Sequence, residues 1–139
     1  GFFEPLKILL ARGKVKPSAE AIYNALQRAP YHISRSRYGI YLALDSLYWS
    51  MVDSSQAAIM MTGNVPPSPE HIPEMLKELF VKNGKLKSKY VDWYNEMYGV
   101  IHHLSKGAML NVPGEKIQEY QKRADIFLGE MAKLVRSLE

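Results

Sequence analysis

The chain has 139 residues, of which 47% are hydrophobic and 23% charged, a balance typical of one globular domain with its own core. This balance excludes a disordered chain, and there is neither an apolar run long enough to span a bilayer nor a signal peptide. The absence of cysteine excludes disulfides and thiolate nucleophiles and fits a reducing compartment, so we predict a cytoplasmic protein without membrane contact. The net charge of +4 points mildly to an anionic partner.

Residues 1–17 are predicted to be a connector or the tail of a preceding domain. The chain starts at Gly1 rather than methionine, and this stretch holds apolar residues that need a surface to cover them. We assign residues 18–139 to a helical bundle.

The first helix of the bundle is predicted to begin at Ser18, whose hydroxyl can cap it. Proline lacks the backbone N–H that a helix interior needs, so Pro30 is expected to end this helix. Its buried side is predicted to carry Ile22, Tyr23, Leu26 and Ala29.

The longest helix is predicted over residues 34–62, a stretch without proline and with apolar residues on two opposite faces. One face carries Ile40, Leu44, Leu47, Met51, Ala58 and Met61, and the other carries Tyr38, Leu42, Trp49, Val52 and Ile59. Between them runs a row of small residues, which is Gly39, Ala43, Ser46, Ser50 and Ala57. Small residues let another backbone approach closely, either a helix of the same chain or its copy across a dimer axis. We therefore predict a homodimer.

Three further helices are predicted after the proline-rich loop at residues 63–69. The third helix ends at Asn83-Gly84, the fourth covers residues 86–109, and the fifth runs from Pro113 to Leu138. No segment alternates with a period of two. The sequence thus predicts an all-α fold, an antiparallel up-and-down bundle of about five helices.

Positive charge is concentrated in two places. The densest run lies between Lys82 and Lys89 and includes Lys85 and Lys87, while Arg35 and Arg37 lie at the entry to the long helix. These side chains are candidates for contacts with phosphate groups. The alternative for the lysine run is a solvated turn.

The polar side of the fourth helix supplies the candidates for chemistry. It carries Asn95, His102, His103 and Lys106, with acid-base groups and positive charge within a turn or two of each other. His102 is the candidate general acid or base, and the others are candidate binding residues. The alternative is that one histidine is half-buried and the other solvated. No spacing typical of a metal site or a glycine-rich phosphate loop is present, so we expect neither metal nor cofactor.

The order of these features resembles the HEPN domain (higher eukaryotes and prokaryotes nucleotide-binding), a helical bundle that packs as a dimer. The resemblance covers residues 18–138. It rests on four stretches: the entry to the long helix (Arg35 to Trp49), the turn FVKNGKL (Phe80 to Leu86), the aromatic-rich fourth helix, and KRADIFLGEM (Lys122 to Met131).

The resemblance implies one of two roles. Many members are metal-independent ribonucleases with an arginine followed, four to six residues later, by a histidine. Others lack this motif and accompany a minimal nucleotidyltransferase, helping to bind nucleotide or polynucleotide. The segment Tyr90 to Gly107 contains no arginine, although Asn95 and His102 have six residues between them.

We therefore favour a non-enzymatic, nucleotide- or RNA-binding module that acts with or is fused to a nucleotidyltransferase. One alternative is an HEPN ribonuclease with a degenerate motif, as the toxin of a toxin-antitoxin pair. The other is a helical dimer that serves only assembly.

Overall fold

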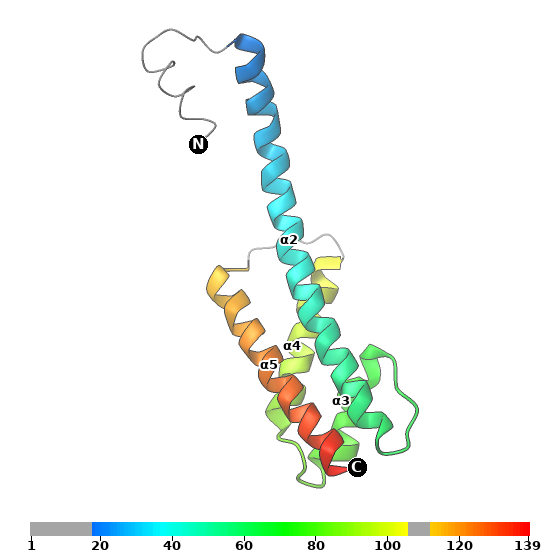
Figure 1. The fold of residues 1–139 in the computed structure, drawn as a ribbon. Helices are drawn as coiled ribbons and strands as arrows, with labels where there is room; N and C mark the ends of the chain where they lie inside the picture. Colours follow the sequence, from blue (N-terminus) through cyan, green and yellow to red (C-terminus); the bar gives the residue numbers. More distant parts are fainter. Residues whose placement is uncertain (1–17, 106–111) are drawn as a thin grey trace. The chain divides into compact units, whose positions relative to one another are not determined.

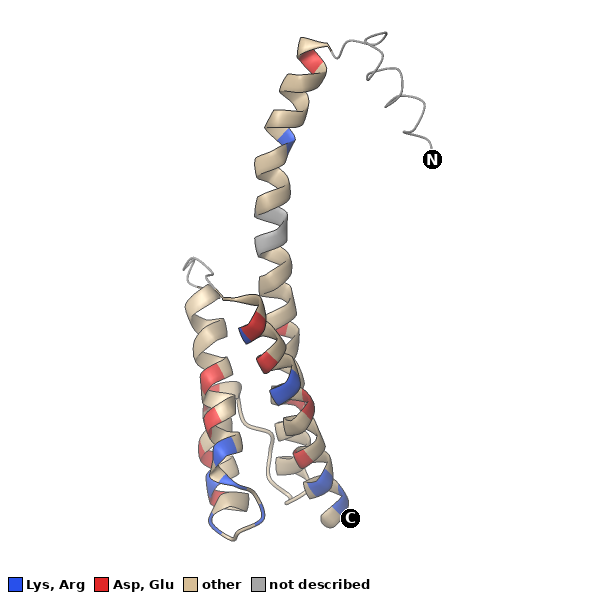
Figure 2. Ribbon diagram, turned by 90° about the vertical axis from the view of Figure 1, so that its left-hand side faces the viewer, with Lys and Arg blue, Asp and Glu red and all other residues tan. Residues whose placement is uncertain are grey.

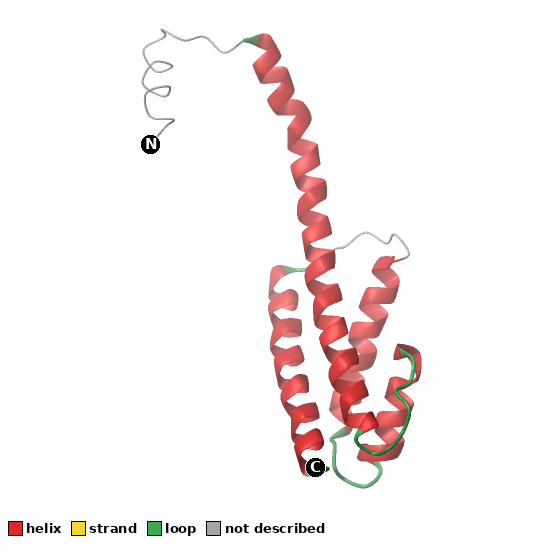
Figure 3. Ribbon diagram, turned by 45° about the vertical axis from the view of Figure 1, so that its right-hand side comes forward, coloured by secondary structure: helices red, strands yellow, loops and turns green. Residues whose placement is uncertain are grey.

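The computed structural model describes residues 18–105 and 112–139. Within this range, residues 34–37 are described by their backbone alone. The described residues form helices and loops without any strand, so the predicted all-α class is confirmed (Figures 1 and 3). The chain divides into two compact units, Gly1–Tyr38 and Gly39–Glu139.

A single helix, α2 (Ala19–Met60), replaces the first two predicted helices, so the bundle has one long helix fewer than expected (Figure 1). The prediction that Pro30 ends a helix is wrong, because Pro30 lies inside α2. Proline leaves the carbonyl of Leu26 without its N–H donor. Both residues are exposed, so water can hydrate that carbonyl and the helix can continue.

The part of α2 in the first unit is exposed on all sides that the structure describes. Ser18 caps it as predicted, accepting a hydrogen bond from the backbone N–H of Ala21 at 3.0 Å. The predicted buried side is wrong: Ile22, Tyr23 and Leu26 are 58%, 62% and 68% exposed. The described residues of this unit form no second element against which those side chains could pack. The predicted connector at residues 1–17 lies outside the described residues.

In the second unit, the carboxyl-terminal part of α2 packs with α4 (Ser88–Ser105), α5 (Gly114–Ser137) and a shorter helical segment. That segment consists of η1 (Pro69–His71), α3 (Ile72–Leu76) and η2 (Lys77–Val81) in immediate succession. Figures 1 and 3 show α2 and α5 running in the same direction, with α4 antiparallel to both. Chain direction therefore alternates from η2 through α4 to α5.

The loop after α2 carries the chain back along the bundle, so α3 runs in the same direction as α2 (Figure 3). Two side chains hold this loop in place. The amide of Gln56 donates to the carbonyl of Pro67 at 2.8 Å, and the hydroxyl of Tyr94 donates to the carbonyl of Pro69 at 2.8 Å. The loop is thus fixed to α2 at Pro67, and the first residue of η1, Pro69, is fixed to α4.

The turn between η2 and α4 ends the helical segment as the sequence predicted. Gly84 has φ of 77°, and its N–H donates to the carbonyl of Val81 at 3.1 Å. The carbonyl of Phe80 accepts from the N–H groups of Lys85 and Leu86 at 2.8 and 3.0 Å. These bonds are those of a glycine-terminated helix end, in which only glycine adopts positive φ without strain.

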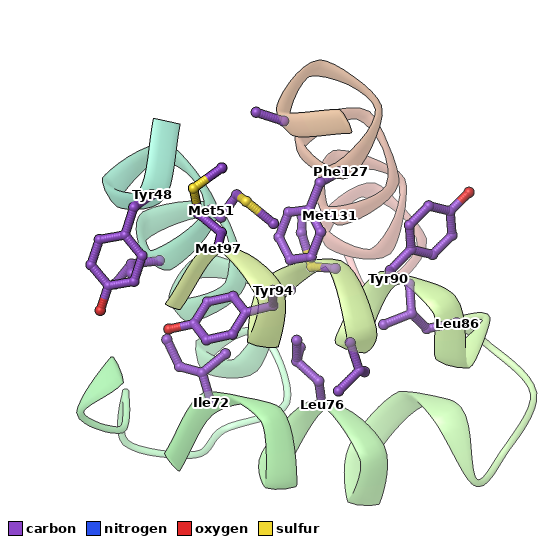
Figure 4. Packing of buried hydrophobic residues seen from close by; sticks show 14 of the residues in the cluster. Tyr48, Met51, Ile72, Leu76, Leu86, Tyr90, Tyr94, Met97, Phe127 and Met131 are labelled. Carbon is purple, nitrogen blue, oxygen red and sulfur yellow. The ribbon is translucent and has the colours of Figure 1, made fainter. Parts of the chain in front are cut away.

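The core lies where α2, α3, α4 and α5 meet, and Figure 4 shows its aromatic and methionine side chains interlocking. Helices α4 and α5 each bury one apolar side in this core. The buried residues of these two helices are Tyr90, Val91, Tyr94, Met97, Ile101, Tyr120, Ala124, Phe127, Met131 and Leu134. Ser55 is the buried polar residue of the core, and its hydroxyl has no hydrogen-bond partner in the described part of the chain.

The two apolar faces predicted for the long helix differ in burial. Leu44, Met51 and Ala58 of the first face are buried, whereas Met61 at its end is exposed. The second face is divided. Its Val52 and Ile59 are fully buried, whereas Tyr38, Leu42 and Trp49 are exposed, so among the described residues this face is fully buried only toward the carboxyl end of α2. None of the described helices combines the length and apolar character needed to cross a membrane.

Candidate functional site

A cavity of about 340 Å³ lies between the turn after η2 and the last turns of α5. The turn contributes Lys85, which directly follows the positive-φ Gly84, and α5 contributes the remaining lining residues at helical spacing. The cavity is lined by Lys85, Glu130, Lys133, Leu134 and Ser137. We call this the lysine pocket.

Figure 2 shows lysine and arginine gathered at the end of the second unit where this turn and the carboxyl end of α5 lie. Some of these lysines form ion pairs with a carboxylate and others do not. Lys82 pairs with Glu78 at 2.5 Å, and Lys133 pairs with Glu130 at 3.2 Å. Lys85 has no carboxylate partner within the described residues, so its charge is available to an anion in the pocket.

The other lysines of the run are not among the residues that line the pocket. Lys87 is exposed and, within residues 18–105 and 112–139, makes no ion pair. The ammonium group of Lys89 lies 5.2 Å from the ring centre of Tyr90 and 5.6 Å from that of Trp93. These contacts direct Lys89 toward aromatic faces rather than toward the pocket.

On the polar side of α4, Asn95, His102 and His103 are all exposed, so the alternative that one histidine is half-buried is wrong. The imidazole of His102 stacks on the ring of Tyr98, with ring centres 5.7 Å apart and planes 9° apart. Lys106 lies outside the described residues. Asn95 and His102 are seven positions apart, which is about 10 Å along the helix, so the Asn95 side chain does not hydrogen-bond the imidazole of His102.

The two groups of candidate residues lie at opposite ends of α4. Lys85 and Lys87 precede its first residue, Ser88, and His102 follows fourteen positions later, which is about 21 Å along the axis. The structure therefore does not bring the lysines and the histidine into one site. The side chains of Arg35 and Arg37 lie outside the described residues.

A cluster of four charges joins α4 to α5. The guanidinium of Arg123 contacts the carboxylate of Glu96 and, at 2.6 Å, that of Glu119, while Lys116 lies 3.1 Å from Glu119 and 3.8 Å from Glu96. Arg123 also covers the ring of Trp93 at 5.3 Å. The hydrogen bond from Lys116 lowers the pKa of Glu119. Two positive and two negative charges cancel, so Arg123 serves the helix contact and is not available to phosphate.

The hydroxyls of Tyr48 and Tyr94, which lie in the core, do not supply a base. Burial is the main cause that raises the pKa of both Tyr94 and Tyr48, so both hydroxyls stay protonated at neutral pH. The described residues also contain no group of three or more histidine, aspartate or glutamate side chains able to hold a metal ion.

The sequence pattern made Lys85 a candidate but did not associate it with Lys133, Glu130 and Ser137, which line the same pocket. Lys133 is 48 positions from Lys85, and no spacing rule connects a turn to a helix so far along the chain. The spacing of Glu130, Lys133 and Ser137 does place them on one side of α5.

Comparison with known proteins found no matching family model, no matching curated protein and no matching solved structure. The resemblance to the HEPN domain therefore rests on the sequence stretches that carry it. Among the described residues, the lysine pocket is the feature whose chemistry points most directly to a ligand.

Proposed function

We propose that this chain is an HEPN-like, nucleotide- or RNA-binding helical module, a homodimer that acts with or is fused to a minimal nucleotidyltransferase. The observation that supports the binding role most directly is the lysine pocket. There Lys85 of the turn and Lys133 of α5 line one cavity, and Lys85 has no carboxylate partner in the described chain.

The pocket suits a phosphate group better than an apolar ligand. Its volume of about 340 Å³ lies within the range of small-ligand sites, and two of its lining side chains are ammonium groups. Lysine contacts phosphate as a point charge and imposes little geometry, which fits binding without base-specific recognition. The Glu130 carboxylate beside Lys133 repels anions, so Lys85 supplies most of the attraction.

The same arrangement disfavours the ribonuclease alternative. A metal-free nuclease needs positive charge beside its acid-base group, to stabilise charge that develops on the phosphate. His102 contacts Tyr98, and the lysine pocket lies about 21 Å away along α4. Lys106, four positions after His102, lies outside the described residues and would act only as a point charge. No described arginine lies on α4.

The test is the salt dependence of RNA affinity. We expect a fluorescent single-stranded RNA to bind with an affinity that falls steeply as salt rises, because binding releases counterions from phosphates. Replacing Lys85 or Lys87 by glutamine should each reduce the slope of log affinity against log salt by about 0.7. Competition by a free nucleotide would separate nucleotide binding from polynucleotide binding.

The matched control is Lys122→Gln, an exposed lysine on α5 eleven positions before Lys133 and about 16 Å from it along the axis. We expect this variant to keep the wild-type slope. An RNA affinity that does not change with salt would contradict the proposal. So would an equal loss of the log affinity against log salt slope in Lys122→Gln, because the lysine run would then be a solvated surface without a specific role.

A further inference from the structure

A second cavity, of about 280 Å³, opens between α2 and α5 and differs from the lysine pocket in its mainly apolar lining. We propose that this groove is the contact surface of the homodimer, with α5 of a second copy packed antiparallel across it. The inference rests on the proposed dimer and assigns it a surface. The groove is lined by Ser54, Ala57, Leu128, Met131, Ala132, Val135 and Arg136.

The groove and the side chain that could fill it lie on the same face. Ser54, Ala57 and Ala132 are small and leave the space open, whereas Leu128 at the edge is 46% exposed. A two-fold dimer places the same patch on both subunits, so each must offer both a hollow and a projection. Leu128 of each copy is the projection, and the groove of the other copy is the hollow. Ala57 belongs to the row of small residues from which the sequence predicts a dimer.

Charge at the two ends of this face selects the antiparallel arrangement. Asp125 and Arg136 are both exposed, and neither makes an ion pair within residues 18–105 and 112–139. They are eleven positions apart, about 16 Å, on the side of α5 that carries Ala132. In an antiparallel α5 pair centred between Glu130 and Met131, each Asp125 faces Arg136 of the partner subunit. A parallel pair would instead oppose like charges.

The same centre places Leu128 in the groove. In this pair, Leu128 lies at the same height along the helix axis as position 133 of the second copy. That height is between Ala132 and Val135, which line the groove of the second copy. Gly129 adds room near the crossing, since a Cβ built there would meet no atom within 4 Å. The steric fit and the charge pairing thus agree on one register.

This surface leaves the lysine pocket open. The lining residues Glu130, Lys133 and Ser137 lie on one side of α5, and Leu128, Ala132 and Val135 lie on another. A dimer built on the groove would therefore present two lysine pockets, one from each subunit.

Charge reversal tests the register. By light scattering after size exclusion at tens of micromolar, we expect the wild-type chain to be a dimer. Asp125→Arg and Arg136→Asp should each weaken it roughly 100-fold, because each reversal opposes like charges at both ends of the interface. The double variant carrying both reversals should recover the dimer, since it restores both pairs with opposite polarity.

A cysteine variant tests the same contact without changing charge. The chain contains no cysteine, so Ala132→Cys would carry the only thiol, and a short bis-maleimide should link two copies. Asp92→Cys, at an exposed position on α4, is the matched control and should remain unlinked.

The possible failures are distinguishable. A wild-type mass near one 15.9 kDa chain would overturn the dimer and its surface together, while leaving RNA binding at the lysine pocket to be judged by its own assay. A wild-type dimer that withstands both single reversals, or that the double variant fails to restore, would overturn this surface alone. Linking of Asp92→Cys but not of Ala132→Cys would overturn it as well.

Discussion

Replacing Phe127 by alanine should lower the free energy of unfolding by about 3–5 kcal/mol, as truncation of a fully buried aromatic side chain typically does. Phe127 is 0% exposed, and its ring lies 6.4 Å from that of Tyr94, between α4 and α5 (Figure 4). Truncation would remove this apolar contact and leave a cavity that the surrounding helices can close only in part. Urea unfolding followed by circular dichroism measures the change.

The control is Ile126→Ala, one position earlier on the same helix and 39% exposed. It has the same backbone setting but a partly solvated side chain, so we expect a loss below about 1 kcal/mol. Equal losses for the two variants would mean that α5 does not bury the face that carries Phe127.

The purified protein should leave single-stranded RNA intact in the absence of metal. The fourth helix has no arginine, so it offers no guanidinium to hold the scissile phosphate beside His102. Loss of one such preorganised donor typically costs about 100- to 1000-fold in rate, and the imidazole alone does not replace it. Incubation of labelled RNA with a chelator, analysed on a denaturing gel, measures the rate.

His102→Ala supplies the decisive comparison. Robust metal-free cleavage that disappears in His102→Ala, with the oligomeric state unchanged, would show that the ribonuclease alternative is right. Cleavage that survives the substitution would identify a contaminating nuclease, and the absence of cleavage in both proteins is the result we expect.

The helices of the second unit were predictable because their periodicity is tied to burial. Tyr120, Phe127 and Met131 recur at intervals of seven and four, which is the spacing of one helix face, and all three are buried. The end of the helical segment at Gly84 was equally predictable from the sequence, since glycine adopts the positive φ of this turn without strain. Local rules were sufficient in both cases.

The first unit was not predictable by the same rules. Proline ends most helices, but Pro30 lies in an exposed stretch where solvent can replace the missing hydrogen bond. Ile22, Tyr23 and Leu26 were expected to be buried because they are apolar. Periodicity shows which side a helix would bury, but not whether another element is there to cover it.

The candidate site was only half predictable. Charge density along the sequence pointed to Lys85, but the pocket also needs Lys133 from a distant helix. The contact of Arg123 with Glu96 was equally hidden, because it spans 27 positions, whereas its contact with Glu119 follows from a four-residue spacing. Tertiary contacts, which no local pattern encodes, decide which charges are free and which are paired.

Lysine acylation in the presence of RNA tests the binding site most directly. Labelling with an N-hydroxysuccinimide ester, read by mass spectrometry, reports which ammonium groups a bound phosphate backbone covers. We predict that saturating single-stranded RNA protects Lys85, Lys87 and Lys133 while labelling of Lys122 stays unchanged. Equal labelling of these four lysines with and without RNA, or protection of Lys122 alone, would contradict the proposal that the lysine pocket binds RNA.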